Sequence, residues 1–326
     1  MFVCSGTEAN DLAMRIARAA SGNHGAIVME NSYHGNSSLI NGLSSCGHFL
    51  STQPDYVATV EPPNIFRGSN RVLDETSGPY YASKVDAAID QLDLAGHGLA
   101  AFMCDSIFDT QGTLEAPKDY FKEVYRRVRA AGGLCIADEV QAGFGRTGEA
   151  MWGFENYDVI PDIVTMGKPM GAGHPVAAVV TTPEIAKEFS RHAFYFNTFG
   201  GNPVSMAAAN AVLSIIQNEK LQRNAESVGG YLKVKLKELS KKYSLIGDIR
   251  GMGLFLGIEL VTSKKDLMPA SKEAKKVAEE MKRAGVLLGV TGMFGNVVKI
   301  RPPLTFSRDN ADELLEKLNV VFENLS

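Results

Sequence analysis

The sequence predicts an α/β protein in which a mostly parallel central sheet is covered by helices and a smaller α+β domain follows. Short, continuous apolar runs alternate with amphipathic helical patterns, and such runs are typical of parallel strands that are buried on both faces. The chain of 326 residues is long enough for about two domains. We expect a large domain over residues 1–215 and a small domain over residues 216–326.

The expected elements follow one another in a regular order. The strands of the large domain are expected at Gly25–Glu30, Gly98–Asp105, Gly133–Asp138, Asp162–Met166 and Val176–Thr181. Amphipathic helices are expected at Glu8–Ser21, Ser83–Leu94 and Tyr120–Ala131. A single long helix is expected from Pro203 to about Tyr243. The small domain is expected to contain a strand pair over Leu245–Leu260, a helix over Ser271–Ala284, a strand over Val297–Ile300 and a helix over Asp309–Leu325.

Composition excludes several classes of protein. Apolar residues make up 45% and charged residues 21%, which is typical of a protein with a large core and not of a disordered chain. The formal net charge of −4 gives no basic field for nucleic acid or for an anionic membrane, and no apolar run reaches 18 residues. The four cysteines lie far apart, with no spacing typical of a metal site. We therefore expect a reduced, cytoplasmic protein with no metal, nucleic-acid or membrane partner.

The chain begins with residues that are typical of a buried strand. Met1–Val3 runs directly into the glycine turn at Gly6, and no basic segment comes before it. We therefore expect the large domain to be truncated at its N-terminus. Glycine is also overrepresented, with 32 residues, which indicates many turns or close approaches of the backbone to a ligand.

Three segments with ligand-binding chemistry lie at the ends of predicted elements. Ser5–Asn10 precedes a helix, and small residues at a helix N-terminus can hold a phosphate group, although an ordinary helix cap has the same composition. Asp138 ends an apolar strand and is followed by Gln141 and a glycine-rich loop. Lys168 follows another strand, between glycine, methionine and proline residues. A lysine that is withdrawn from water in this way can form a Schiff base.

Together the three segments match the needs of pyridoxal 5′-phosphate (PLP). A lysine holds this cofactor, an acid keeps the pyridine nitrogen protonated, and a helix N-terminus holds the phosphate. An aromatic ring should also cover the pyridine, and Tyr33 follows a predicted strand at a suitable place. The combination is much more specific than any one of the three segments.

The sequence resembles the class III (omega-type) aminotransferases, which are PLP enzymes of fold type I. The matching segments are SGTEAN (5–10), YHG (33–35), ADEVQAGFGRTG (137–148), PDIVTMGKPMGAGHP (161–175) and FNTFGGNP (196–203). Some segments are similar to the alanine–glyoxylate aminotransferase subgroup and others to the ethanolamine-phosphate phospho-lyase subgroup.

The resemblance implies a role at the cofactor site for individual residues. Lys168 would form the Schiff base, Asp138 would pair with the pyridine nitrogen, Gln141 would lie near the 3-hydroxyl, Ser5, Gly6 and Thr7 would surround the phosphate, Tyr33 would stack on the ring with His34 beside it, and Thr198 would reach the phosphate of the partner subunit. The family builds its active sites at a dimer interface, and a homodimer is therefore expected.

One departure from the family pattern affects the substrate. Many members have an arginine that grips the substrate's α-carboxylate two residues before the position of Arg301, and this chain has Lys299 there. Lysine lacks the planar fork that binds a carboxylate through two hydrogen bonds. Lys299 and Arg301 are both candidate substrate residues.

Three functions follow from these residues. The first is transamination between a small amine or ω-amino acid and a keto acid. The second is elimination of phosphate from a small phosphorylated amine, which Lys299 motivates. The third is a non-catalytic relic that binds PLP without turnover.

Overall fold

The computed structural model describes residues 1–46 and 53–325, which form two compact units. The first unit consists of Met1–Ser106, Ala116–Phe144 and Trp152–Ile215. The second unit consists of Ile107–Glu115, Gly145–Met151 and Ile216–Ser326. Two segments that precede residue 215 thus belong to the second unit. The assignment of a cofactor domain to residues 1–215 is a functional one and stays a prediction.

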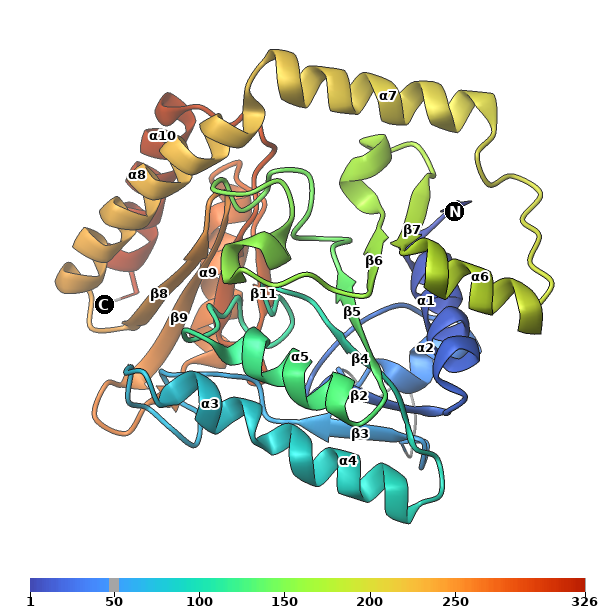
Figure 1. Ribbon diagram of the computed structural model, residues 1–326. Helices are drawn as coiled ribbons and strands as arrows, with labels where there is room; N and C mark the ends of the chain where they lie inside the picture. Colours follow the sequence, from blue (N-terminus) through green and yellow to red (C-terminus); the bar gives the residue numbers. More distant parts are fainter. Residues whose placement is uncertain (47–52, 326) are drawn as a thin grey trace. The chain divides into compact units, whose positions relative to one another are not determined.

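The first unit contains a seven-stranded sheet, in the order β1-β7-β6-β5-β4-β2-β3 (Figure 1). Its strands are β1 (Phe2–Val3), β2 (Gly25–Met29), β3 (Val57–Val60), β4 (Leu99–Cys104), β5 (Leu134–Asp138), β6 (Ile163–Met166) and β7 (Ala177–Thr181). The five strands from β3 to β6 in this order are parallel. β7 is antiparallel to both of its neighbours. The mostly parallel sheet that the sequence predicts is therefore confirmed.

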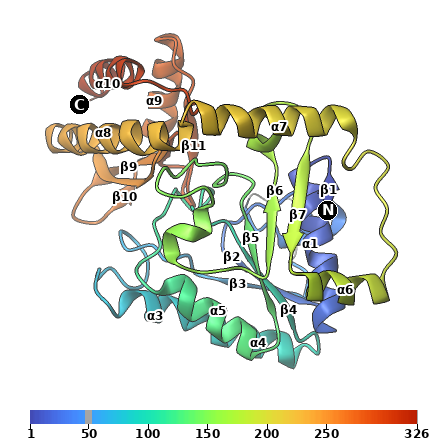
Figure 2. The same cartoon turned by 45° about the horizontal axis from the view of Figure 1, so that its top comes forward.

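Helices cover both faces of this sheet. They are α1 (Gly6–Ser21), α2 (Ser38–Leu43), α3 (Ser77–Ala82), α4 (Lys84–Leu94), α5 (Tyr120–Ala130) and α6 (Pro183–His192), with 3₁₀ turns η1 (Gly153–Tyr157) and η2 (Lys168–Gly171). α1 lies on one face and packs against β4 to β7, while α4 and α5 lie on the other (Figure 2). The buried side of α1, which includes Leu12, Ala13 and Ile16, forms one core with the apolar strand residues.

Strand register brings chemically useful residues to one edge of the sheet. Cys104 pairs with Ala137, and Asp138 pairs with Thr165, so β4, β5 and β6 end side by side. Asp105, Asp138 and Lys168 lie at or just beyond these carboxyl ends, where open α/β sheets bind ligands.

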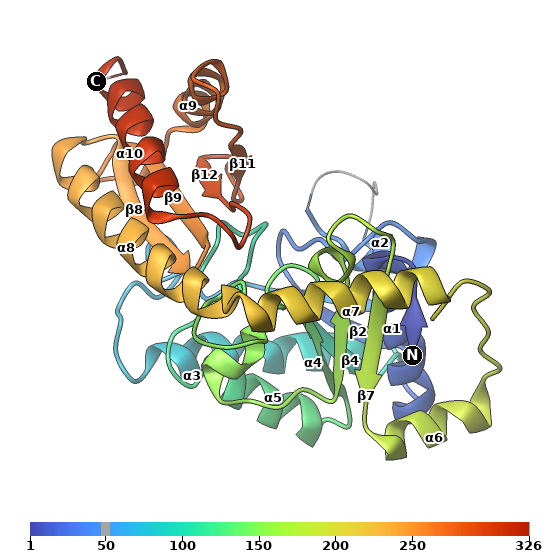
Figure 3. The same cartoon turned by 90° about the horizontal axis from the view of Figure 1, so that it is seen from above.

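The second unit is an antiparallel sheet packed on helices (Figure 3). Its strands are β8 (Ile246–Met252), β9 (Phe255–Ser263), β10 (Met268–Pro269), β11 (Gly289–Thr291) and β12 (Val297–Ile300). Its helices are α8 (Leu221–Lys242), α9 (Ser271–Arg283) and α10 (Arg308–Glu323). Among the helices of the described residues, none is long and apolar enough to cross a membrane.

The long helix predicted over residues 203–243 is wrong. The segment forms two helices, α7 (Pro203–Asn218) and α8, and Lys220 between them has a left-handed backbone with φ of 52°. A non-glycine residue in this conformation ends an α-helix, because the backbone can no longer follow the right-handed path. The apolar pattern on both sides of Lys220 hid the break.

Candidate active site

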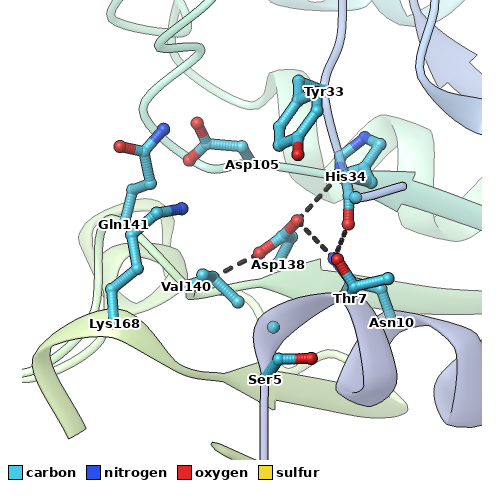
Figure 4. Close-up of a pocket in the computed structure, with 12 residues that line it drawn as sticks. Ser5, Thr7, Asn10, Tyr33, His34, Asp105, Asp138, Val140, Gln141 and Lys168 are labelled. Atoms are coloured by element: carbon cyan, nitrogen blue, oxygen red, sulfur yellow. Dashed lines mark hydrogen bonds and ion pairs between the residues drawn. The ribbon is translucent and has the colours of Figure 1, made fainter. Parts of the chain in front are cut away.

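A cavity of about 180 Å³ lies at the carboxyl edge of the first unit's sheet. Of the nine predicted cofactor residues, those that line it are Ser5, Gly6, Thr7, Tyr33, His34, Asp138, Gln141 and Lys168 (Figure 4). They come from the start of α1, the segment after β2 and the ends of β5 and β6. Among the described residues, no group of three or more His, Cys, Asp or Glu side chains could hold a metal ion.

The N-terminus of α1 forms one wall of this cavity. Ser5 is the N-cap residue, and its Oγ accepts a hydrogen bond from the Glu8 N–H at 3.2 Å. The Glu8 carboxylate accepts in turn from the Cys4 N–H at 2.7 Å. These contacts fix the helix start, where the first N–H groups have no partner within the helix. The wall can therefore bind an anion through backbone N–H groups and the helix dipole.

Two glycines let backbone segments approach one another at this wall. A Cβ on Gly6 would lie 2.9 Å from Cγ1 of Val140, which is shorter than a normal contact. Gly35 has φ of 140°, and a Cβ there would lie 2.7 Å from Oγ1 of Thr7. A larger residue at either position would push these segments apart or fill the space beside the helix N-terminus.

Asp138 is buried at the floor of the cavity and is held by three donors. Its Oδ2 lies 2.8 Å from Nδ1 of His34 and accepts a hydrogen bond from Nδ2 of Asn10 at 2.9 Å. Its Oδ1 accepts from the Val140 N–H at 3.1 Å. Figure 4 shows these partners around the carboxylate at the floor of the cavity.

These donors determine the charge of Asp138. Burial by itself raises the pKa of a carboxyl group, because it disfavours the charged form. The hydrogen bonds from His34 and Asn10, with positive charge at His34 and Lys168, outweigh burial, and the pKa of Asp138 is lowered. The cavity thus contains a carboxylate that stays ionised at neutral pH and can pair with a protonated ring nitrogen.

Lys168 lies at the mouth of the cavity, directly after β6. Its side chain extends toward Asp138 and Gln141 (Figure 4) and is exposed to solvent. The expectation that this lysine is withdrawn from water is therefore not met, because its side chain points into the open cavity and not into the core. Its backbone has φ of 27°, a strained value for a residue with a Cβ, and such strain is common at functional sites.

Three predicted residues lie away from this cavity's lining. Thr198 is exposed in the segment between α6 and α7 of the first unit. Lys299 belongs to the second unit, where its Nζ lies 3.0 and 3.1 Å from the two carboxylate oxygens of Asp109. The Arg301 guanidinium lies 5.7 Å from the centre of the Phe255 ring in the same unit. The charge of Lys299 is thus balanced within its own unit.

Two residues of the cavity were missed at the level of sequence. Asn10 donates to both the His34 backbone oxygen, at 2.7 Å, and Asp138. Its position one helical turn after Gly6 could have indicated it, because residues four apart share a helix face. Asp105 lines the cavity at the end of β4. The predicted strand that ends in Asp105 already carried that signal.

The cavity fits PLP by the chemistry of its walls. Lys168 would hold the cofactor's aldehyde carbon, ionised Asp138 would pair with the pyridine nitrogen, and the N-terminus of α1 would bind the phosphate. The space that a Cβ on Gly35 would fill, beside Thr7, lies next to that N-terminus. Each wall thus offers the donor or acceptor that one end of the cofactor requires.

Comparisons with known proteins show the family of the chain. The family model described as "Aminotransferase class-III" matches residues 1–322. The chain is 44% identical over 322 residues to the alanine–glyoxylate aminotransferase 2-like protein of Drosophila melanogaster. It is 41% identical over 337 residues to ethanolamine-phosphate phospho-lyase homolog 1 of Caenorhabditis elegans. These alignments include 96% and 98% of the chain, which spans 65% and 72% of the two relatives.

Solved structures of a phospholyase and of an amine transaminase are also similar to this chain. A phospholyase from Arthrobacter in complex with phosphoethanolamine is 43% identical, with a TM-score of 0.96, over 100% of this chain and 77% of that one. An amine transaminase from an uncultivated Pseudomonas species, solved in the PLP-bound form, is 29% identical with a TM-score of 0.91. That match includes 100% of this chain and 76% of the other. Fold type I is therefore confirmed.

Proposed function

Because the chain belongs to the class III aminotransferase family, whose cofactor is PLP, we propose that it transfers an amino group between a small amine or ω-amino acid and a keto acid. The observation that supports this most is a single cavity that contains Lys168, ionised Asp138 and the N-terminus of α1. The chain spans 65% of the length of its Drosophila relative, and the proposal concerns the protein of which this chain forms the cofactor site.

We assign a role to each residue of the cavity. Lys168 holds the cofactor covalently through its Nζ, and Asp138 holds the pyridine nitrogen with His34 and Asn10 behind it. Ser5, Gly6 and Thr7 surround the phosphate. Tyr33, whose side chain is 42% exposed, is free to lie over the ring face, and Gln141 lies on the side of the 3-hydroxyl.

The protein's own contribution to the reaction is acid–base and electrostatic. When bound, the cofactor supplies an electron sink for the carbon that carries the amine. The negative charge of Asp138 keeps the ring nitrogen protonated, which strengthens that sink. Once a substrate amine has taken its place, Nζ of Lys168 would take the proton from the substrate carbon and deliver it to the cofactor carbon that the lysine had held. Its exposed position in the cavity gives it the freedom to do so.

A donor screen tests this function. Amines and ω-amino acids are added without a keto acid, and conversion of the cofactor to its amine form is followed by absorbance. We expect conversion with at least one donor, and none in Lys168→Ala. Lys122→Ala, which changes a partly exposed lysine of α5 that pairs with Asp158, should behave as wild type. Absence of conversion across the panel in a cofactor-loaded protein would rule out transamination.

A second function is phospho-lyase activity on a small phosphorylated amine. Lys299 supports it, because its pairing with both oxygens of Asp109 leaves a poor grip for a substrate carboxylate. The solved phospholyase from Arthrobacter also has a high overall similarity to this chain. Release of phosphate and ammonia without a keto acid would favour this activity. A protein that binds PLP but converts no substrate in either assay would instead favour the relic.

We also propose a homodimer in which Thr198 reaches the phosphate of the partner subunit. Its exposure, together with that of Phe196 and Phe199 beside it, supports an interface at this segment. For the compartment we propose the cytoplasm, because no cysteine of the described residues forms a disulfide. Two relatives, from Arabidopsis thaliana and Homo sapiens, have mitochondrial names, so fractionation of the source cells is the direct test.

A further inference from the structure

Glu139 follows Asp138 in the chain but lies on the other side of the cavity wall. Its side chain has 0% exposure, and it is not among the residues that line the cavity. Its carboxylate accepts three hydrogen bonds within the first unit. Oε1 accepts from Oγ of Ser106 at 3.1 Å and from the Phe154 N–H at 3.0 Å, and Oε2 accepts from the Gly153 N–H at 2.7 Å.

The backbone of Glu139 connects two more segments. Its N–H donates to the Thr165 oxygen at 2.9 Å, and its own oxygen accepts from the Gly143 N–H at 3.1 Å. Ser106 follows Asp105, Gly143 follows the turn that contains Gln141, and Thr165 precedes Lys168 by three residues. One residue therefore holds the ends of β4, β5 and β6 and the start of η1 in a single arrangement.

The start of η1 is packed closely against this carboxylate. A Cβ on Gly153 would collide with Oγ of Ser106 and would lie 2.6 Å from Cβ of Ala142. Only glycine therefore lets the start of η1 bring its two N–H groups to Glu139. The three donors come from two segments of the chain. Gly153 and Phe154 follow Ser106 by 47 and 48 positions.

A carboxylate at this place is costly, which argues for a specific role. Burial raises the pKa of Glu139 to about 7, against the three hydrogen bonds that lower it, and the charge of Asp105 adds to the increase. A glutamine at position 139 would place its NH₂ group, which donates, opposite groups that also donate. This neutral side chain of the same shape therefore cannot accept all three hydrogen bonds. The site requires a group that only accepts.

We propose that Glu139 is a positioning residue that sets the relative placement of Asp138, Gln141, Asp105 and Lys168 around the cofactor. This proposal rests on the proposed PLP function, because its consequence is the geometry of that cavity. A residue that holds the side chains around a bound group in place determines whether that site is tight enough to work.

The test compares Glu139→Gln and Ser106→Ala with wild type. Thr165→Val is the matched control, because Thr165 is equally buried, pairs with Asp138 in the sheet, and has a hydroxyl without a hydrogen-bond partner in the described chain. We measure the melting temperature of the cofactor-free protein, the Kd for PLP and the circular dichroism of bound PLP. The dichroism reports the asymmetry of the surroundings of the PLP ring.

We expect Glu139→Gln to weaken PLP binding on the order of tenfold or more and to change the dichroism per bound cofactor. Ser106→Ala should do the same to a smaller degree, about two- to fivefold in Kd, because one of three donors is lost. Thr165→Val should match wild type in both readouts. If Glu139→Gln does not fold, the smaller change in Ser106→Ala decides the test.

A lowered melting temperature with unchanged Kd and dichroism would overturn the proposal, because Glu139 would then serve stability alone. Unchanged values in Ser106→Ala would also contradict it when Glu139→Gln cannot be measured. A failure of transamination alone shows in the donor screen and leaves these readouts unchanged. If the protein does not use PLP at all, wild type itself shows no PLP binding.

Discussion

At the residue scale, the charge of Asp138 is the feature on which the site depends. Asn10 and His34 reach its carboxylate from α1 and from the segment after β2, and the Val140 N–H reaches it from its own strand end. Each donor favours the ionised form, and together they outweigh the cost of burial. A buried carboxylate with this set of partners is well suited to hold a protonated nitrogen.

The lowered pKa of Asp138 predicts a pH-dependent contribution to stability. The ionised form is favoured in the folded chain, so the contribution is present above the ordinary value of 3.8 and is lost as pH falls through the lower folded value. We expect Asp138→Asn to lower the free energy of unfolding of the cofactor-free protein at pH 6. Urea denaturation should show the difference between the two proteins shrinking below about pH 4. An equal difference in the free energy of unfolding at pH 6 and below about pH 4 would contradict the assignment of a charged Asp138.

Sequence reasoning predicted most of the residues that line the cavity but not their surroundings. Lys168, Asp138 and Ser5–Asn10 could be predicted because each has a distinct residue type at the end of a predicted element. The partners of Asp138 could not, since Asn10 and Asp138 are 128 positions apart and meet only through strand order and register. The exposure of Lys168 was also missed, because apolar neighbours in the chain do not determine where a side chain points.

At the element scale, the largest difference from expectation is the break between α7 and α8. Four of the five parallel strands, β2, β4, β5 and β6, were predicted almost to the residue, because apolar runs bounded by glycine and carboxylates are distinctive. The fifth, β3 (Val57–Val60), was missed. The antiparallel direction of β7 was not predicted, since direction depends on the path of the connection and not on strand composition. Helix α6 was also missed, although Thr182, Pro183 and Glu184 form a recognisable helix start.

The left-handed backbone at Lys220 predicts that glycine is tolerated there. Lys220→Gly removes the steric penalty of a Cβ at φ of 52°, against the larger entropy that glycine has in the unfolded chain. We expect the free energy of unfolding to stay equal or rise by up to about 1 kcal/mol. Lys220→Val should lower it, because a β-branched residue is strained further in this conformation. Chemical denaturation of the two variants measures both effects, and a loss in the glycine variant would show that the side chain of Lys220 matters more than its backbone.

At the scale of the whole molecule, exposed aromatic side chains gather in the segment between α6 and α7. Phe194, Phe196 and Phe199 are 89%, 72% and 68% exposed. Large apolar side chains that are exposed together in one segment are typical of a surface that another protein covers. Because Thr198 lies among them, the proposed dimer would cover this segment and bring Thr198 to the partner's phosphate at the same time.

This interface predicts a coupled loss of assembly and cofactor binding. Phe196→Ser should weaken the dimer, which sedimentation velocity measures across a concentration series, and should also raise the Kd for PLP about tenfold or more. Leu94→Ser is the control, because Leu94 is 90% exposed at the end of α4, away from Thr198 in the chain. Equal assembly of Phe196→Ser and wild type would place the interface elsewhere.

The most direct test of the central claim is to identify the residue that holds the cofactor. The protein is incubated with PLP and treated with borohydride, which fixes the cofactor irreversibly to the amine that holds it, and the digested peptides are analysed by mass spectrometry. We predict one pyridoxyl phosphate group on the peptide that contains Lys168, and no labelling at this site in Lys168→Ala. Labelling at another lysine in wild type, or no stable labelling at all, would contradict it.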